Sequence, residues 1–594
     1  MIFSTEKWTL MNCNPRPMQV DIINEILEAM DKGYKNIILE AGTGSGKSAI
    51  ATTIANYVDD SYIVTMTNQL LQQYLNDFDY MVEQIKGRAN YQCNYGGTCE
   101  ECEVVNRNQQ RIKNYAIARK KHKENPGRYA PPIKPDRLKK CNDCPYSLAF
   151  KNALSSHDII TNYDFLHYAG NYAQMLPERD LIIFDESHNF ERKVMQLIVR
   201  TFNRKVIYKE YNFDIFDGIV ENNMTLKEIQ SPSYWIGVCD KIINIVIGKK
   251  NSYIKATYGE DSFLVLMKED ETIKGYDKDI KKYDEMTDIL KQNEWIIETP
   301  TKRQILNDDT YLTNNKAAGL QVELKPMTIA DHTETLLHFG DIRLFMTGTL
   351  GNKEMFCKWI GIDPDETYYI YQKSPFPVEN RPIIRDYAGK MSGRDKETKE
   401  PNWKNEDALI KIMDILEDHK GEKGVIHVSS NEQAWWIRNE LKDYTRRWFK
   451  IAYGKKREQA IAEFEEDERD MVLIGAGIKD GIDLSNEKCR FQIIFKIPFP
   501  SLAGAQVNIR RKYDPEWYIY QTVMPLMQAY GRGIRNEHDY CTTYVLDSDM
   551  ESLLNNHLHL FNQYFIEAIK DFTIPAPKRV KRVKRRAKVL SEGK

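Results

Sequence analysis

The sequence predicts an α/β protein built from two units, each with a parallel sheet. Two series of short, apolar, β-branched runs support this prediction, because such runs are typical of buried parallel strands and helical stretches separate them. The first series lies at 36–39, 63–65, 158–161, 181–184 and 344–346. The second lies at 424–428, 471–474, 492–497 and 543–546, with a helical pattern at 431–442.

The size and charge of the chain limit the class of protein to which it can belong. Its 594 residues, 42% of them hydrophobic, can form more than one core, so we expect three or four domains. The 84 Lys and Arg are balanced by 86 Asp and Glu, so any nucleic-acid surface is local. No stretch approaches the roughly 18 apolar residues of a membrane helix, and the first residues lack a signal-peptide pattern. We therefore expect a soluble, cytoplasmic protein.

Two segments interrupt the first unit. The segment 87–157 holds five of the ten cysteines and, between 111 and 140, eleven Lys or Arg against two acidic residues. The segment 204–328 is rich in charged and aromatic residues, with helical patterns at 233–246 and 280–291 and no recognisable strand. We therefore expect a first unit at 1–86, 158–203 and 329–352, a cysteine-rich insert, a mainly helical insert, a second unit at 353–575 and a basic tail at 576–594.

A glycine-rich segment, A-G-T-G-S-G-K-S, follows the first predicted strand directly, and residues 48–57 can form a helix after it. Glycines let backbone N–H groups converge on phosphate oxygens, a lysine reaches the β- and γ-phosphates and a serine hydroxyl ligates Mg²⁺. The strand before and the helix after argue against a chance glycine-rich turn. The segment therefore predicts an ATP site that contains Ala41, Gly42, Thr43, Gly44, Ser45, Gly46, Lys47 and Ser48.

The sequence D-E-S-H follows the apolar run 181–184. Carboxylates at the end of a buried strand cost free energy unless they hold a metal or polarise water. We expect Asp185 and Ser48 to hold Mg²⁺, and Glu186 to orient and deprotonate the water that attacks the γ-phosphate. We assign His188 to the same site, against the alternative of an ordinary hydrogen-bonded histidine.

The second unit contains Q-A-Y-G-R-G-I-R at 528–535. Arg532 and Arg535 lie three residues apart on one face of a helix, from which both can reach an interdomain cleft and neutralise charge on the γ-phosphate. A merely solvated basic face is the alternative, but it leaves the two glycines of the segment unexplained. We therefore expect arginine fingers here.

Taken in order, these motifs resemble those of superfamily 2 DNA helicases of the XPD and DinG type, which carry iron–sulfur clusters. Residues 16–19, 185–188 and 347–350 resemble the adenine-reading segment, the D-E-A-H box and the S-A-T-L motif. Residues 479–483, 497–500 and 528–535 resemble W-E-G-x-D, L-P-F-P and Q-x-x-G-R-x-x-R. The resemblance adds Gln19, Gly481, Asp483 and Gln528 to the nucleotide site. It implies two RecA-like motor domains, with an iron–sulfur domain and an arch-like helical domain inserted in the first.

Five cysteines lie in the first insert. The C-x-x-C pairs at 99–102 and 141–144 have the spacing of a structural Zn²⁺ site, whereas a [4Fe–4S] cluster also takes four thiolates and tolerates varied spacing. The family position favours the cluster. By resemblance its ligands are Cys93, Cys99, Cys102 and Cys144, with Cys141 as an alternative. The basic and aromatic residues of the same insert suit a surface that guides a nucleic-acid strand.

These observations predict an ATP- and Mg²⁺-dependent DNA helicase that acts as a monomer, moves along single-stranded DNA and opens duplex or forked DNA. The resemblance implies travel from 5′ to 3′. One alternative is an ATP-driven translocase, or an enzyme that resolves RNA–DNA hybrids, without processive duplex unwinding. The other is a non-enzymatic nucleic-acid-binding protein with a relic ATP site. For the basic tail at 578–588, three alternatives stay open: a disordered solubilising end, a nonspecific phosphate tether and, third, a nuclear-import signal.

Overall fold

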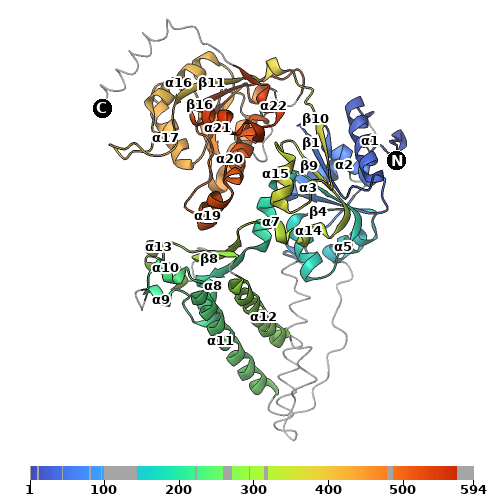
Figure 1. The fold of residues 1–594 in the computed structure, drawn as a ribbon, viewed down its shortest axis with the longest axis vertical. Coiled ribbons are helices and arrows are strands. Elements are labelled where there is room, and N and C mark those ends of the chain that lie inside the picture. Colours follow the sequence, from blue (N-terminus) through green and yellow to red (C-terminus); the bar gives the residue numbers. More distant parts are fainter. Residues whose placement is uncertain are drawn as a thin grey trace.

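The computed structural model describes residues 2–9, 13–42, 44–78, 82–94, 96–99, 144–220, 224–258, 271–292, 294–312, 319–477, 484, 486–534 and 536–570. Two α/β domains lie beside each other, and a helical domain extends away from them (Figure 1). Within these residues, no helix combines the length and the apolar character needed to cross a membrane.

A seven-stranded parallel sheet forms the centre of the first domain, in the order β10-β1-β9-β5-β2-β4-β3. The strands are β1 (Asn36–Ala41), β2 (Ser61–Thr65), β3 (Glu83–Gln84), β4 (Asp158–Asn162), β5 (Arg179–Phe184), β9 (Gly340–Thr347) and β10 (Thr367–Gln372). All five predicted runs of the first series are strands of this sheet. Helices α1 (Pro17–Asp31), α2 (Lys47–Ala55), α3 (Asn68–Phe78), α5 (Pro145–Ser155), α6 (Tyr163–Leu166), α7 (Phe190–Ile198), α14 (Glu334–Leu337) and α15 (Lys353–Ile360) connect them.

The position of β10 differs from the predicted domain boundary. The sequence places residues 353–372 in the second unit, whereas β10 pairs in parallel with β1 along its whole length. Because β10 lies at the edge of the sheet and is only partly buried, it lacks the continuous apolar run of a central strand. We propose that the first domain extends to residue 372.

The second domain has its own seven-stranded parallel sheet, in the order β13-β14-β12-β15-β16-β11-β17. Its strands are β11 (Ile383–Gly389), β12 (Gly424–Val428), β13 (Phe449–Ala452), β14 (Val472–Ala476), β15 (Phe491–Ile494), β16 (Thr542–Asp547) and β17 (Ile569–Lys570). Its helices are α16 (Glu406–Asp418), α17 (Asn431–Leu441), α18 (Arg457–Glu466), α19 (Ala505–Tyr513), α20 (Pro515–Tyr530), α21 (Asp549–His557) and α22 (Gln563–Ile566). The prediction of two α/β units is confirmed.

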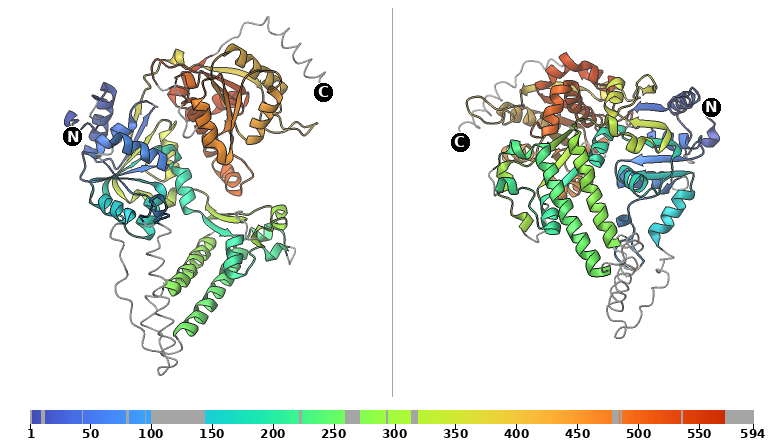
Figure 2. Two further views of the ribbon diagram at one scale, coloured as in Figure 1. Left: turned by 180° about the vertical axis from the view of Figure 1, so that it is seen from behind. Right: turned by 60° about the horizontal axis from the view of Figure 1, so that its bottom comes forward.

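The segment after α7 forms the helical domain. It contains α8 (Arg204–Tyr211), α9 (Asp217–Val220), α10 (Leu226–Ile229), α11 (Pro232–Tyr258), α12 (Glu271–Lys291) and α13 (Lys302–Leu306). Figure 2 shows α11 and α12 packed side by side as a pair that projects from the two α/β domains. The expectation that this insert has no strands was wrong.

An antiparallel sheet joins the helical domain to the rest of the chain, with β8 (Gln321–Pro326) between β6 (Arg200–Asn203) and β7 (Trp295–Glu298). The sequence of β8, Q-V-E-L-K-P, alternates polar and apolar residues, and only Val322, Leu324 and Pro326 are buried. Such an alternation is typical of a strand with one solvated face, which an analysis based on continuous apolar runs does not detect.

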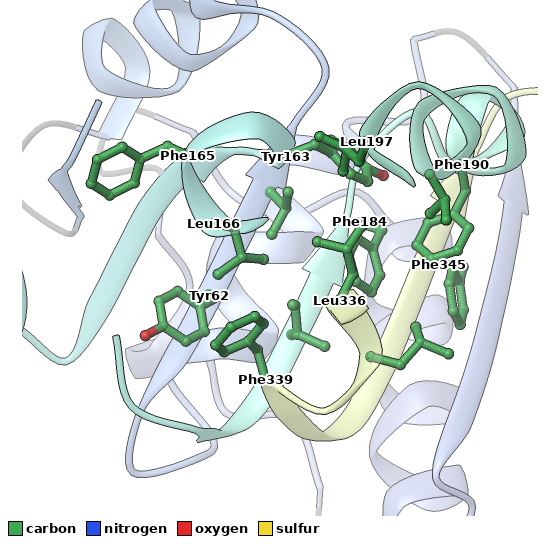
Figure 3. Packing of buried hydrophobic residues seen from close by; sticks show 14 of the residues in the cluster. Tyr62, Tyr163, Phe165, Leu166, Phe184, Phe190, Leu197, Leu336, Phe339 and Phe345 are labelled. Atoms are coloured by element: carbon green, nitrogen blue, oxygen red, sulfur yellow. The ribbon is translucent and has the colours of Figure 1, made fainter. Parts of the chain in front are cut away.

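The core of the first domain fills both faces of its sheet. Successive side chains on a strand point to opposite faces, so Ile182 and Phe184 join one apolar cluster while Leu181 and Ile183 join the other. Figure 3 shows the first of these clusters. Phe345 stacks on Phe184 with ring centroids 5.3 Å apart.

Replacing Phe345 with Ala should therefore destabilise the first domain by about 3–5 kcal/mol, because it removes a buried ring and leaves a cavity. The shift in the midpoint of urea unfolding measures the effect. Tyr513→Ala is the control, since Tyr513 is 76% exposed and a surface change costs no more than about 0.5 kcal/mol. Equal midpoints for the two variants would contradict this assignment of the core.

Candidate functional site

The predicted phosphate loop connects β1 to α2. Gly44 and Gly46 both have φ near +80°, the left-handed region that favours glycine. The Lys47 ammonium donates a hydrogen bond to the carbonyl oxygen of Ala41 over 3.0 Å, so it lies across the mouth of the loop. Lys47 begins α2 and Ser48 follows it, so the backbone N–H groups of the first turn, which have no partner within the helix, lie beside the loop. Thr43 lies outside the described residues.

Gln19 packs directly against this loop. Its side-chain amide donates to the Ser45 carbonyl over 3.0 Å, and its side-chain oxygen accepts from the backbone N–H of Arg16 over 2.9 Å. Arg16 in turn donates to the Gly44 carbonyl over 2.7 Å. A side chain at Gly46 would place a Cβ 2.2 Å from the Gln19 amide nitrogen, so the close approach requires glycine. Gln19 therefore has a direct structural link to the loop.

Asp185 follows β5 and is 95% buried. Tyr74, on α3, donates its hydroxyl to one carboxylate oxygen over 3.1 Å, and the backbone N–H of Glu186 donates to the other over 2.9 Å. The pKa of Asp185 is raised to about 6, first by burial and then by the Glu186 carboxylate, while the charge of Lys47 opposes the shift. Tyr74 lies 111 residues away from Asp185 and belongs to none of the predicted motifs, so sequence reasoning did not select it.

Glu186 and His188 connect this strand end to β9. Glu186 has φ 51°, a left-handed conformation that costs on the order of 1–3 kcal/mol in a residue other than glycine. The Nδ1 atom of His188 lies 3.3 Å from the Glu186 carboxylate and 2.9 Å from the Thr347 hydroxyl. Thr347 begins the T-G-T-L segment, and its hydroxyl bonds the Thr349 carbonyl. The D-E-S-H and T-G-T-L segments are therefore in direct contact.

Glu40, the residue before the loop, is a second buried acid, 1% exposed. Its carboxylate accepts hydrogen bonds from the Leu350 N–H (2.9 Å), the Tyr369 hydroxyl (2.7 Å) and the Asn562 amide (3.2 Å). Burial raises the pKa of Glu40, and these bonds oppose the shift. Asn562 belongs to the second domain, so Glu40 links the loop, T-G-T-L and the other domain.

The remaining predicted nucleotide residues belong to the second domain. Gln528 is a buried residue in the last turn of α20, and half-buried Arg532 follows the end of this helix. Gly533 lies against Cys541, because a Cβ at position 533 would be 2.7 Å from its sulfur. The contacts above join Gln19, the loop, Asp185, Glu186 and His188 within the first domain. Gly481, Asp483 and Arg535 lie outside the described residues.

Three of the five clustered cysteines are described, and they lie near one another. Cys99 and Cys144 are close enough for each to affect the pKa of the other, and Cys93 also affects Cys99 electrostatically. Burial raises the pKa of Cys99. Burial also opposes ionisation of Cys144, but hydrogen bonds from Ser147 and Tyr146 lower its pKa overall.

The predicted ligands Cys102 and Cys141 lie outside the described part of the chain. Within that part, no three His, Cys, Asp or Glu side chains form a group that could hold a metal ion. Because only three of the clustered cysteines are described, a site with four thiolate ligands would have to include Cys102 or Cys141.

Comparison with known proteins agrees with this arrangement. A family model described as Helicase C-terminal domain matches residues 412–559, and one described as Type III restriction enzyme, res subunit matches residues 12–209. The fold is similar to a solved XPD helicase, with a TM-score of 0.54 and 16% identity over 91% of this chain and 96% of that one. The S. tokodaii Xpd4 structure gives a TM-score of 0.50 and 15% identity over 94% and 100%.

The chain therefore contains a region that matches the Helicase C-terminal domain, and its fold is similar to that of XPD helicases. Two relatives share sequence with it over shorter stretches. The Fanconi anemia group J protein homolog of Gallus gallus is 28% identical over 107 residues, 16% of this chain and 8% of that protein. The Probable ATP-dependent helicase of Methanocaldococcus jannaschii is 22% identical over 256 residues, 39% of this chain and 38% of that protein. The matched stretches thus span well under two thirds of either relative.

In this XPD-like chain the raised pKa of Asp185 predicts a pH-dependent stability. A pKa above the ordinary 3.8 means that folding favours the protonated carboxyl, so its stabilising effect is full below about pH 4 and is lost as pH rises through about 6. Asp185→Asn should therefore raise the melting temperature relative to wild type at about pH 8 and have little effect at about pH 4. Calorimetry in buffer without Mg²⁺ or nucleotide measures this difference.

Asp341→Asn, at an exposed position of β9, is the matched control and should not reproduce the pH dependence. A gain in melting temperature for Asp185→Asn that is the same at both pH values would contradict burial as its cause.

Proposed function

We propose that this protein is an ATP-dependent DNA helicase that translocates on single-stranded DNA, from 5′ to 3′, and unwinds duplex or forked DNA. The contact between D-E-S-H and T-G-T-L through His188 and Thr347 is the observation that carries the proposal. A lone ATPase site has no need for such a link, whereas a motor must transmit the state of the γ-phosphate to distant segments.

The first-domain residues supply the parts of a hydrolytic site. Lys47 would bind the β- and γ-phosphates, Ser48 and Asp185 would hold Mg²⁺, and Glu186 would orient the attacking water and accept its proton. The metal held by these residues would supply positive charge that stabilises the phosphates. Tyr74 restrains the Asp185 carboxylate, which favours one geometry at the metal position. Arg532 and Arg535 would stabilise charge on the γ-phosphate from the second domain.

The names of relatives support a role on DNA. The chain resembles proteins named Fanconi anemia group J protein homolog and Regulator of telomere elongation helicase 1 homolog, the latter from Aedes aegypti at 27% identity over 111 residues. We propose a monomer in the cytoplasm as the working form. A translocase or an RNA–DNA hybrid resolving enzyme without processive unwinding is the second candidate, because both would use the same nucleotide site.

The adjacent thiols of Cys99 and Cys144 fit a thiolate-ligated centre. We propose that Cys93, Cys99, Cys144 and Cys102 hold a [4Fe–4S] cluster, with Cys141 as the alternative fourth ligand and Zn²⁺ as the alternative metal. Such a centre would cross-link the cysteine-rich insert at the point where it leaves and rejoins the first domain.

Lys47→Ala should lower ATP hydrolysis in the presence of single-stranded DNA by about a hundredfold or more, because a charge-stabilising donor is lost, while DNA binding remains. Coupled ATPase and fluorescence anisotropy assays measure the two properties. Lys404→Ala is the control, since Lys404 forms a surface ion pair with Glu400 and should leave both unchanged. A Lys47→Ala protein that still separates strands would refute the assignment of this loop as the ATP site that drives unwinding.

Strand-displacement assays with wild-type protein on forked DNA and on an RNA–DNA hybrid separate the candidates. Displacement of DNA from the fork supports the helicase. ATP hydrolysis with removal of a bound protein roadblock, but without displacement, supports the translocase. Absence of hydrolysis even with single-stranded DNA would favour the non-enzymatic alternative.

Cys144→Ser should lower the iron content of anaerobically purified protein from about four atoms per chain and remove its brown colour. Metal analysis and absorption spectra measure both. Cys239→Ser is the matched control, because Cys239 is buried in the helical domain and has no role in the proposed centre. A colourless wild-type protein with stoichiometric zinc would favour the zinc alternative.

A further inference from the structure

Glu191 lies three residues after His188, in the first turn of α7. Its carboxylate is directed at the second domain, where it accepts hydrogen bonds from three side chains. The Trp517 indole N–H donates over 3.0 and 3.1 Å to the two oxygens, and the Gln521 amide donates over 3.0 Å. Arg510 donates a charge-assisted bond to the same carboxylate. No motif of the nucleotide site includes Glu191.

Arg510 is buried, and the side chain of Glu191 is only 12% exposed. Arg510 is 1% exposed, and its guanidinium lies 4.0 Å from the centroid of the Trp517 ring. Burial raises the pKa of Glu191, and the charge and hydrogen bond of Arg510 oppose the shift. Burying two charges costs free energy that is recovered only when geometry and hydrogen bonds are both favourable. Removing one partner would therefore leave the other charge buried and uncompensated.

On the side of the first domain, Glu191 is attached rigidly to the hydrolytic residues. The neighbouring Phe190 packs against Phe184 and Phe345, with ring centroids 5.0 and 5.6 Å apart (Figure 3). Phe184 is the last residue of β5, directly before Asp185. A displacement of Glu191 would therefore be transmitted through α7 and this aromatic cluster to the strand end that holds Asp185 and Glu186.

On the side of the second domain, the donors of Glu191 lie at the start of α20 and on α19. Gln521 is nine residues before the end of α20, about 14 Å along a helix axis. Gln528 belongs to the last turn of this helix, and Arg532 follows its end. Pro525 interrupts the backbone hydrogen bonds of α20 between these positions, but buried side chains on both sides of it keep the two halves of the helix packed. A contact at one end can therefore influence the position of Arg532 at the other end.

Neighbouring contacts hold the same two helices. Asp514, between α19 and α20, accepts from the Trp359 indole of α15 over 2.8 Å, and the Tyr520 hydroxyl donates to the Leu350 carbonyl over 3.0 Å. Figure 1 shows α7, α15 and α19 meeting where the two α/β domains approach each other. Among these contacts, Glu191 is the one that lies closest in sequence to D-E-S-H.

We propose that Glu191 is a positioning residue of the ATPase, which holds α19 and α20 against α7 so that the arginines after α20 are aligned with the D-E-S-H residues. The inference rests on the proposed function. A role limited to stability would lower the melting temperature without changing turnover in the protein that remains folded. A positioning role changes kcat and leaves the ATP affinity of the first domain largely intact.

The test is a double-mutant cycle with Glu191→Gln and Arg510→Gln, assayed for DNA-stimulated ATPase well below the melting temperature of each variant. Each single variant should lower kcat about tenfold, a typical coupling between sites, and change KM for ATP by no more than about threefold. The double variant should be no slower than either single one, because the two residues act as a pair. Glu191→Asp, which keeps the charge, should recover part of the loss.

Asp214→Asn is the matched control, because Asp214 forms a buried pair with Arg204 inside the helical domain, at 2.6 Å and away from α7. It should lower the melting temperature but not basal ATPase. Full kcat in Glu191→Gln, or additive losses in the double variant, would overturn the inference. If Glu191→Gln does not fold, kcat of Glu191→Asp tests the inference instead: a kcat equal to that of wild type would overturn it. A wild-type protein without ATPase activity would instead refute the proposed function.

Discussion

The hydrogen bonds made by carboxylates near the ends of β1 and β5 are the interactions on which the rest of this structure depends. Glu40, Asp185 and Glu191 are each removed from water, which is costly for an ionised group. Each is stabilised by donors from elsewhere in the fold: Tyr74 for Asp185, Leu350, Tyr369 and Asn562 for Glu40, and Arg510, Trp517 and Gln521 for Glu191. The need to satisfy three acids therefore fixes how the segments that carry the motifs meet.

The sequence predicted the parts of the fold that depend on local pattern. The buried runs became strands, and the glycine-rich segment lies between a strand and a helix as expected. The sequence did not identify β10 or the small antiparallel sheet, because edge and half-solvated strands lack a continuous apolar run. Nor did it identify the partners of the acids. Glu191 and Arg510 are 319 residues apart, and Glu40 and Asn562 are 522 apart, distances over which one sequence carries no pairing signal.

The same buried acids also link the two α/β domains, because Glu40 and Glu191 each accept hydrogen bonds from the second domain. Parallel sheets are stiff, and their helices pack at near-crystalline density, so motion between the domains must occur at their interface. Hydrogen bonds at that interface are directional and can exchange partners when the domains move. A purely apolar interface would only oppose separation of the domains. Glu40 and Glu191 supply such contacts on either side of the hydrolytic residues, which suits an interface that must report the state of bound nucleotide.

The helical domain is tied to the same hairpin of α19 and α20. Gln506 of α19 donates to the Met327 carbonyl over 3.1 Å, and its backbone N–H donates to Glu298 of β7 over 3.3 Å. A side chain at Gly504 would clash with Glu298, 2.6 Å from its added Cβ, so the contact is close. Helix α19 thus contacts the base of the insert through Gln506 and Glu191 through Arg510, two residues that lie one turn apart on the same face. A strand of nucleic acid that displaced the insert would therefore act on this hairpin. Under the proposed positioning role of Glu191, such a displacement would couple nucleic-acid binding to hydrolysis.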